Sequence, residues 1–218
     1  MIAPLTIIFD CDGVLVDSER LSHSVLMDML AEYGQPISLQ DTFDLFMGTS
    51  EEKGLAVLSE LIGRPAPLDF SSTFRDRTFE AFKRSLAPIP GITDVLQSLK
   101  HPYCVASNGP REKMRFTLVH TGLLPHFDGR LYSAEDVARP KPAPDLFLHV
   151  AHAMGADSRS CVVVEDSSTG VTAAKAAGMY VLGYAAMGQE AKLLSAGADQ
   201  VLLSMSNFHH ALLAASDA

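Results

Sequence analysis

Two aspartates separated by a single residue, Asp10 and Asp12, are the side chains of this sequence best suited to chemistry. They directly follow an apolar run at residues 5–9, whose β-branched and aromatic members predict a buried strand. Two carboxylates at a strand end are costly as structure alone, because like charges repel and resist burial. The pattern indicates either a site for a divalent cation or a nucleophile paired with an acid/base.

A serine and a lysine could supply contacts to an anion. Ser107 ends a predicted strand, so its hydroxyl could donate to a phosphoryl oxygen, together with the backbone amides near Asn108. Ser-Asn-Gly is also ordinary turn chemistry, and for this segment taken alone a structural turn is the favoured interpretation. Lys141 stands between two prolines before a predicted helix, and its constrained backbone distinguishes it from an ordinary solvated lysine.

A second pair of acids, Glu165 and Asp166, lies at the end of the predicted strand 160–165. Carboxylate oxygens from two separate strand ends suit Mg²⁺, which takes few protein carboxylates and keeps several waters. Asp166 or Ser167 could instead cap the helix that follows. A capping role would not explain both acids, so the pair favours a metal site.

The elements between these residues predict how they come together. We predict strands at 5–9, 103–107, 130–133, 160–165 and 180–184, a short sixth at 200–203, and helices at 92–99, 111–121, 144–154 and 168–177. Strands that alternate with helices predict an α/β fold with a doubly wound, mainly parallel sheet. Right-handed crossovers place the loops after the strands on one edge of the sheet, where ligands bind in such folds.

Residues 17–87 break this alternation, because they show only helical periodicity. Apolar residues recur at helical spacing up to Gly34, and residues 41–46, 51–61 and 70–86 continue the pattern. We therefore predict an α/β core domain at residues 1–16 and 88–218 and a small helical domain at 17–87. A helical layer packed permanently on the sheet is the alternative.

Four segments, in this order, resemble the motifs of the haloacid dehalogenase superfamily, in its phosphatase and β-phosphoglucomutase-like branch. They are Asp10-Cys11-Asp12-Gly13, Ser107-Asn108-Gly109, Lys141-Pro142-Ala143-Pro144-Asp145 and Glu165-Asp166. The resemblance covers roughly the whole chain and implies a Rossmann-like core with an inserted helical cap. Pro140 stands where many relatives carry glycine, a departure that does not affect the lysine.

The resemblance implies a role for each residue that would meet the substrate. Asp10 would attack phosphorus and form an aspartyl-phosphate, while Asp12 would protonate the leaving alcohol and later take a proton from water. Ser107 and Lys141 would hold the phosphoryl oxygens as part of the catalytic set, with Asn108 beside them in the substrate site.

The resemblance also implies Mg²⁺ as the cofactor. Its ligands would be Asp10, the backbone carbonyl of Asp12, and Asp166. Glu165 would act through a bound water.

Other chemistries of the superfamily fit these residues less well. A dehalogenase needs the nucleophile but neither metal nor acid, so Asp12 argues against it. Phosphonate cleavage uses a Schiff-base lysine in the cap, and Lys53 and Lys83 lack a clear context for that role.

A β-phosphoglucomutase is the main alternative, because it shares all four motifs. Such mutases resemble this chain less in the cap, where Ser22 replaces their histidine and Glu51 stands in place of an arginine. His23 lies one residue later, which is a rotation of about 100° on a helix, so we expect it at the surface or at the cap interface.

We therefore expect a phosphatase of a small phosphorylated metabolite. The resemblance is strongest to bacterial phosphatases of sugar phosphates and sugar-acid phosphates, including 6-phosphogluconate phosphatases. A non-catalytic binding protein that kept the fold is the less favoured alternative.

Composition and charge narrow the possible partners and compartment. The net charge of −9 and the absence of Lys/Arg blocks argue against a nucleic-acid partner. Three widely spaced cysteines predict reduced thiols rather than a disulfide framework. No signal peptide is predicted before Leu5 and no apolar run approaches the length of a membrane span, so we expect a cytoplasmic protein without membrane contact. We expect a monomer or a weak homodimer.

Overall fold

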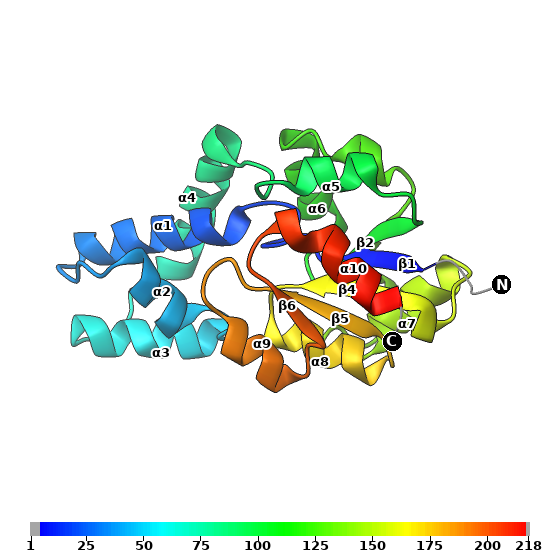
Figure 1. Cartoon of the computed structure of the whole chain (residues 1–218). Coiled ribbons are helices and arrows are strands. Elements are labelled where there is room, and N and C mark those ends of the chain that lie inside the picture. The colour runs from blue at the N-terminus through cyan, green and yellow to red at the C-terminus, as the bar shows by residue number, and fades with distance from the viewer. Residues whose placement is uncertain (1–4, 217–218) are drawn as a thin grey trace. The chain divides into compact units, whose positions relative to one another are not determined.

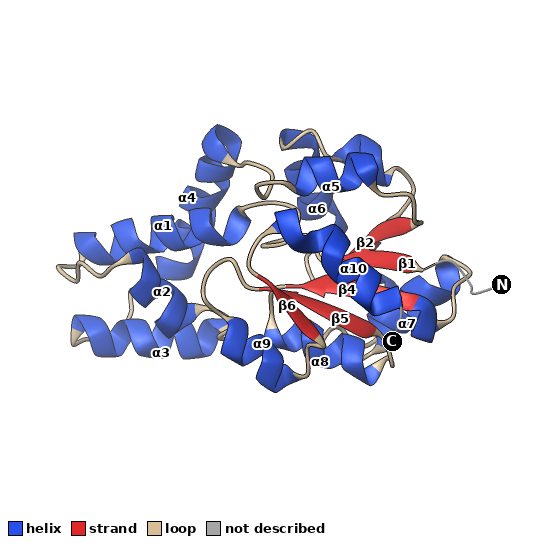
Figure 2. Ribbon diagram, viewed as in Figure 1, coloured by secondary structure: helices blue, strands red, loops and turns tan. Residues whose placement is uncertain are grey.

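The computed structural model of this protein describes residues 5–216. Figure 2 shows its helices and strands. The strands are β1 (Thr6–Phe9), β2 (Tyr103–Ser107), β3 (Leu131–Ser133), β4 (Cys161–Glu165), β5 (Tyr180–Tyr184) and β6 (Gln200–Leu202). The α-helices are α1 (Ser18–Glu32), α2 (Leu39–Phe46), α3 (Glu51–Ile62), α4 (Phe70–Ser85), α5 (Ile92–Ser98), α6 (Arg111–His120), α7 (Asp145–Ala153), α8 (Ser168–Ala176), α9 (Glu190–Ala196) and α10 (Phe208–Ser216).

The chain divides into two compact units. The first, called the core unit below, comprises Met1–Asp17 and Ala87–Ala218, and the second, the helical unit, comprises Ser18–Leu86. The predicted domains, 1–16 with 88–218 and 17–87, stay a proposal. Residues 1–4 and 217–218 lie outside the described residues, and so does the signal-peptide prediction, which concerns the residues before Leu5.

The core unit contains one six-stranded sheet in the order β3-β2-β1-β4-β5-β6, and all its pairings are parallel. β1 lies between β2 and β4, with Phe9 opposite Val105 on one side and Val164 on the other. The carboxyl ends of these three central strands therefore meet at one edge of the sheet. This arrangement confirms the predicted fold class.

Side chains that alternate along each strand bury both faces of the sheet, as a parallel sheet requires. Figure 1 shows α8 and α9 on one face and α10 on the other. Ile8 and Val163 belong to the cluster beneath α7, α8 and α9, whereas the ring of Phe9 faces the other way. It stacks on Phe208 at the start of α10, with ring centroids 5.8 Å apart.

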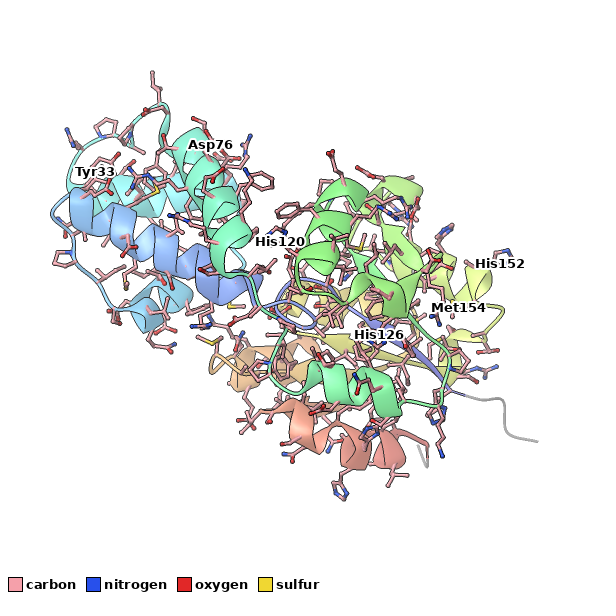
Figure 3. All side chains as sticks on the ribbon, turned by 90° about the horizontal axis from the view of Figure 1, so that it is seen from above. Tyr33, Asp76, His120, His126, His152 and Met154 are labelled. Atoms are coloured by element: carbon pink, nitrogen blue, oxygen red, sulfur yellow. The ribbon has the colours of Figure 1, made fainter. Side chains whose placement is uncertain are left out.

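The helical unit has a small apolar core of its own. Leu26, Met29 and Leu30 of α1 pack in one cluster with Leu58 and Phe70. Tyr33, labelled in Figure 3, follows α1 and places its ring 6.1 Å from that of Phe70. The apolar residues that recur at helical spacing in α1 thus form one buried face, which α3 and α4 cover.

Local signals explain where the helices of this unit begin. Ser38 caps α2 in a capping box, because its hydroxyl accepts from Asp41 N while the Asp41 side chain accepts from Ser38 N. Ser50 caps α3 by accepting from Lys53 N.

The core unit contains two helices that the sequence patterns do not predict, α9 and α10. Both are short; α9 packs against α8, β5 and β6, and α10 packs against β6. The strand and helix predictions elsewhere agree with the structure to within one or two residues at each end.

Candidate active site

The loop after β1 presents the two predicted aspartates at the carboxyl edge of the sheet. The backbone N–H of Asp10 donates to Val164 O at 2.9 Å, which holds the loop against β4. Gly13 then turns the chain with φ +74°, a conformation that L side chains rarely adopt. A Cβ at Gly13 would overlap the Asp166 carboxylate, so the missing side chain lets Asp166 approach the first loop closely.

Lys141 lies buried at the centre of the site, with 5% of its surface exposed. Its ammonium donates to Asp10 Oδ1 at 2.6 Å, to Glu165 Oε1 at 2.6 Å and to the carbonyl of Ala106 at 2.9 Å. Burial alone would lower the pKa of Lys141, but the charges of Asp10 and Glu165 raise it above its usual value. The lysine is therefore a fixed cation between two carboxylates.

The negative charges close to Asp10 outnumber the single positive charge of Lys141. Burial raises the pKa of Asp10 to about 7; Lys141 opposes the shift, and the nearby Glu165 and Asp12 add to it. An additional cation at this carboxylate would stabilise its ionised form. The electrostatics thus fit a site for a divalent metal ion.

The donor atoms also fit the predicted Mg²⁺ site. Within residues 5–216, no group of three or more His, Cys, Asp or Glu side chains is arranged to hold a metal ion. The predicted site needs only two carboxylates, from Asp10 and Asp166, because its third protein ligand is the backbone carbonyl of Asp12. Oxygen donors of this kind, completed by water, are what Mg²⁺ prefers.

Glu165 is completely buried, and the structure gives both its oxygens protein partners. Oε1 accepts from Lys141, while Oε2 accepts from Ser167 Oγ at 2.8 Å and from Ser167 N at 3.2 Å. Ser167, not Asp166, caps α8 by accepting from Gly170 N at 3.0 Å. Glu165 is thus a counter-ion of Lys141, a role that the sequence patterns missed; its water-mediated metal contact stays a prediction.

Asn108 holds the backbone of Lys141 in place. Its side-chain Nδ2 donates to Lys141 O at 3.1 Å, and its Oδ1 accepts from Lys141 N at 3.0 Å. Both polar atoms of the Asn108 side chain are therefore engaged with the Lys141 backbone, and the place of Asn108 in the substrate site stays a prediction. Ser107, buried at the end of β2, accepts from Gly109 N at 3.0 Å.

One cation at this edge did not emerge from the sequence. Lys113, in the first turn of α6, donates to Asp12 Oδ2 at 2.8 Å. It lies six residues after Ser107 in a helix with several charged residues. Only the parallel topology, which sets β2 beside β1, brings it to the first loop.

His23 is buried inside the helical unit, so the surface, one of its two expected positions, is wrong, while the cap interface stays a prediction. Its ring stacks on Phe43 with centroids 4.1 Å apart, and Nδ1 lies 3.1 Å from Thr42 Oγ1. The reason is helical spacing, since His23 is three and seven residues before the buried Leu26 and Leu30. Burial lowers the pKa of His23 to about 4.

The chain matches the family model described as haloacid dehalogenase-like hydrolase over residues 7–184. This span contains the Asp10 loop, Ser107, Lys141 and the Glu165–Asp166 pair. The chain therefore belongs to the haloacid dehalogenase-like hydrolase family, and the prediction of that family is confirmed.

Several relatives of this chain are named phosphatases. The 6-phosphogluconate phosphatase of Escherichia coli (strain K12) is 32% identical over 181 residues, which cover 83% of this chain and 82% of that protein. The fructose-1-phosphate phosphatase YqaB of the same strain is 34% identical over 179 residues, covering 79% and 92%. The predicted enzyme class, a phosphatase of this hydrolase family, is confirmed.

Solved structures share the fold across nearly the whole chain. A hydrolase of this family from Deinococcus radiodurans R1, crystallised with bound phosphate and sodium, is 32% identical with a TM-score of 0.88. The similarity covers 98% of this chain and 97% of that one. In the described part of this chain, none of the helices combines the length and apolar character needed to cross a membrane.

Proposed function

We propose that this protein is a Mg²⁺-dependent phosphomonoester hydrolase that acts on a small phosphorylated sugar or sugar acid through an aspartyl-phosphate at Asp10. The observation that carries the proposal is the buried pair of Asp10 and Lys141 at 2.6 Å, with Asp12 two residues along the same loop. The named activities of the similar E. coli phosphatases support the substrate class.

The proposed reaction has two steps that share one nucleophile. A carboxylate oxygen of Asp10 attacks phosphorus in line, the bond from phosphorus to the leaving oxygen breaks, and Asp12 gives that oxygen a proton. A water then attacks phosphorus, gives a proton to Asp12 and releases the Asp10 carboxylate with inorganic phosphate. Together the two steps restore the free Asp10 carboxylate and the proton on Asp12.

The remaining polar groups hold the transferring phosphoryl group. Ser107 Oγ and the backbone amides of its turn would donate to phosphoryl oxygens. Lys141 would exchange one of its present contacts for a phosphoryl oxygen, while Asn108 keeps its backbone in place. Asp10, the carbonyl of Asp12 and Asp166 would hold Mg²⁺, which supplies positive charge that offsets the charge growing on the phosphoryl oxygens.

The other parts of the assignment are also proposals. The division into two compact units supports a separate cap domain at residues 17–87. The three cysteines, all free and buried in the described structure, support a reducing cytoplasmic environment.

Phosphate release from a panel of esters tests this function. We expect release from 6-phosphogluconate or fructose 1-phosphate with Mg²⁺ and loss of release after chelation. Mn²⁺ should substitute, because it accepts the same oxygen ligands. The panel includes β-glucose 1-phosphate with a hexose bisphosphate. If β-glucose 1-phosphate is converted to glucose 6-phosphate faster than phosphate is released, the protein is a mutase and the proposed hydrolase function is wrong.

A further inference from the structure

We propose that Lys113 is a positioning residue that holds the carboxylate of Asp12 in the orientation needed for both proton transfers. The inference rests on the proposed function, since it concerns the acid/base of that reaction. Its starting point is the contact of 2.8 Å between Lys113 Nζ and Asp12 Oδ2.

The other lysine of the site cannot serve Asp12 as well. An ammonium has three N–H donors, and those of Lys141 are directed to Asp10, Glu165 and Ala106 O. Asp12 pairs instead with a cation from a different element, α6. The site therefore divides its two cations, with Lys141 at the nucleophile and Lys113 at the acid/base.

Contacts of Arg111, the first residue of α6, hold the helix turn that contains Lys113 in place. Arg111 forms a bidentate contact with Asp136, with Nη2 at 2.6 Å from both carboxylate oxygens, and also donates to Leu131 O. The N–H of Arg111 donates to Glu135 Oε2 at 3.3 Å. Both acids lie in the short 3₁₀ helix Ala134–Asp136 after β3. These contacts fix the start of α6 relative to the sheet, and Lys113 is two residues further along.

Gly109 provides the space in which three of these groups approach one another. A Cβ there would lie 3.3 Å from Ser107 Oγ, 3.7 Å from Asp12 Oδ2 and 3.8 Å from Lys113 Cδ. The Gly109 backbone is itself held at both ends, because its N–H donates to Ser107 and its carbonyl accepts from Ser133 Oγ at 2.8 Å. Ser107 and Asp12 thus approach each other at one short turn, whose backbone is held by hydrogen bonds at Gly109.

The contact is placed to affect catalysis more than stability. The side chains of Lys113 and Asp12 are 43% and 18% exposed, and ion pairs this accessible contribute little to folding. Lys113 itself transfers no proton. In the first step the proton passes from Asp12 to the leaving oxygen, in the second from water to Asp12, and the ammonium limits the rotation of that carboxylate throughout.

The test compares Lys113→Met with Lys113→Arg and with a matched control, Lys175→Met. Lys175 forms a similar exposed pair with Asp199, at 2.7 Å, but near the start of β5 and β6, at the opposite edge of the sheet. With 6-phosphogluconate or fructose 1-phosphate as substrate, we expect Lys113→Met to lower kcat about tenfold with a small change in KM. Lys113→Arg should recover most of the loss, and the control should match the wild type.

A double-mutant cycle with Asp12→Asn decides whether Lys113 acts through Asp12. The readout is the first-turnover release of p-nitrophenol from p-nitrophenyl phosphate, whose leaving group needs no proton, together with steady-state turnover. In the Asp12→Asn background, Lys113→Met should change neither rate by more than about twofold.

Equal losses in both backgrounds, or a rise in KM with kcat unchanged, would overturn the inference and make Lys113 a substrate contact. Normal turnover of Lys113→Met would overturn it too, while leaving the proposed hydrolase intact. A wild-type enzyme that releases no phosphate would instead reject the proposed function, and the inference with it.

Discussion

The close approach of α8 to Glu165 makes Gly170 the most informative position for a single substitution. A Cβ at Gly170 would overlap the Glu165 carboxylate, which is completely buried and pairs with Lys141. Gly170→Ala therefore forces that carboxylate away from its partners. In an ordinary helix position the same substitution would stabilise the protein by about 1 kcal/mol.

Two opposing magnitudes decide the outcome. Separating a buried charge from its partner costs about 3–5 kcal/mol. After the gain in helix propensity, we expect Gly170→Ala to lose about 2–4 kcal/mol of unfolding free energy. For a chain of this size that is a fall in Tm of roughly 5–15 °C. Activity should fall as well, because Lys141 loses one of the two carboxylates that fix it.

Thermal and urea unfolding measure the effect, with Gly54→Ala as the matched control. Gly54 is also a helical glycine, but a Cβ there would meet Thr49 Oγ1 at 3.7 Å and Phe46 Cδ1 at 3.9 Å, which is ordinary contact. The control should be neutral or more stable. If Gly170→Ala is as stable and active as the control, Glu165 does not have the role assigned here.

Three further outcomes follow from the structure. In the folded state the pKa of His23 is about 4, whereas in the unfolded chain it is near 6.5. The free energy of unfolding should therefore fall as the pH is lowered from about 6.5 to 4, because the unfolded state binds the proton first. The loss should be about 2 kcal/mol, since Glu19, 3.9 Å away, offsets part of the penalty, and His23→Phe should abolish it in urea titrations at pH 7 and 4.5. Asn108→Ala removes both contacts to the Lys141 backbone and should lower kcat/KM about tenfold, a loss of the size expected for a hydrogen bond near a charged group. Asp12→Asn should reduce turnover of a sugar phosphate by ~10²-fold or more, and full activity would reject its role in proton transfer.

The sequence predicts the sheet because its signals are local. Each central strand is a short run of β-branched or aromatic residues that ends in polar residues, and parallel pairing then brings those ends together. The sequence alone therefore assigns Asp10, Ser107 and Glu165 to one edge of the sheet. Lys141 could be included because two prolines single it out.

The contacts that the sequence missed depend on packing between distant segments. Lys113 and Asp12 are 101 residues apart, and no local pattern relates them. The carboxylate of Glu165 turns inward to Lys141 because Gly170 leaves room for it, which the helical pattern of α8 does not reveal. For His23, the rotation of about 100° from Ser22 predicts a position at the surface or at the cap interface, whereas its spacing to Leu26 and Leu30 places it on the buried face of α1.

If Asp10 is the nucleophile, it becomes phosphorylated during turnover, and the phosphoryl group can be trapped. The wild-type enzyme is mixed with Mg²⁺ and 6-phosphogluconate or fructose 1-phosphate, quenched in acid within the first turnover, digested and mapped by mass spectrometry. We expect one phosphoryl group on the peptide that contains Asp10, absent from Asp10→Asn and absent after chelation. Rapid phosphate release with no phosphoryl group on that peptide, or equal release by Asp10→Asn, would contradict the role of Asp10 as the nucleophile.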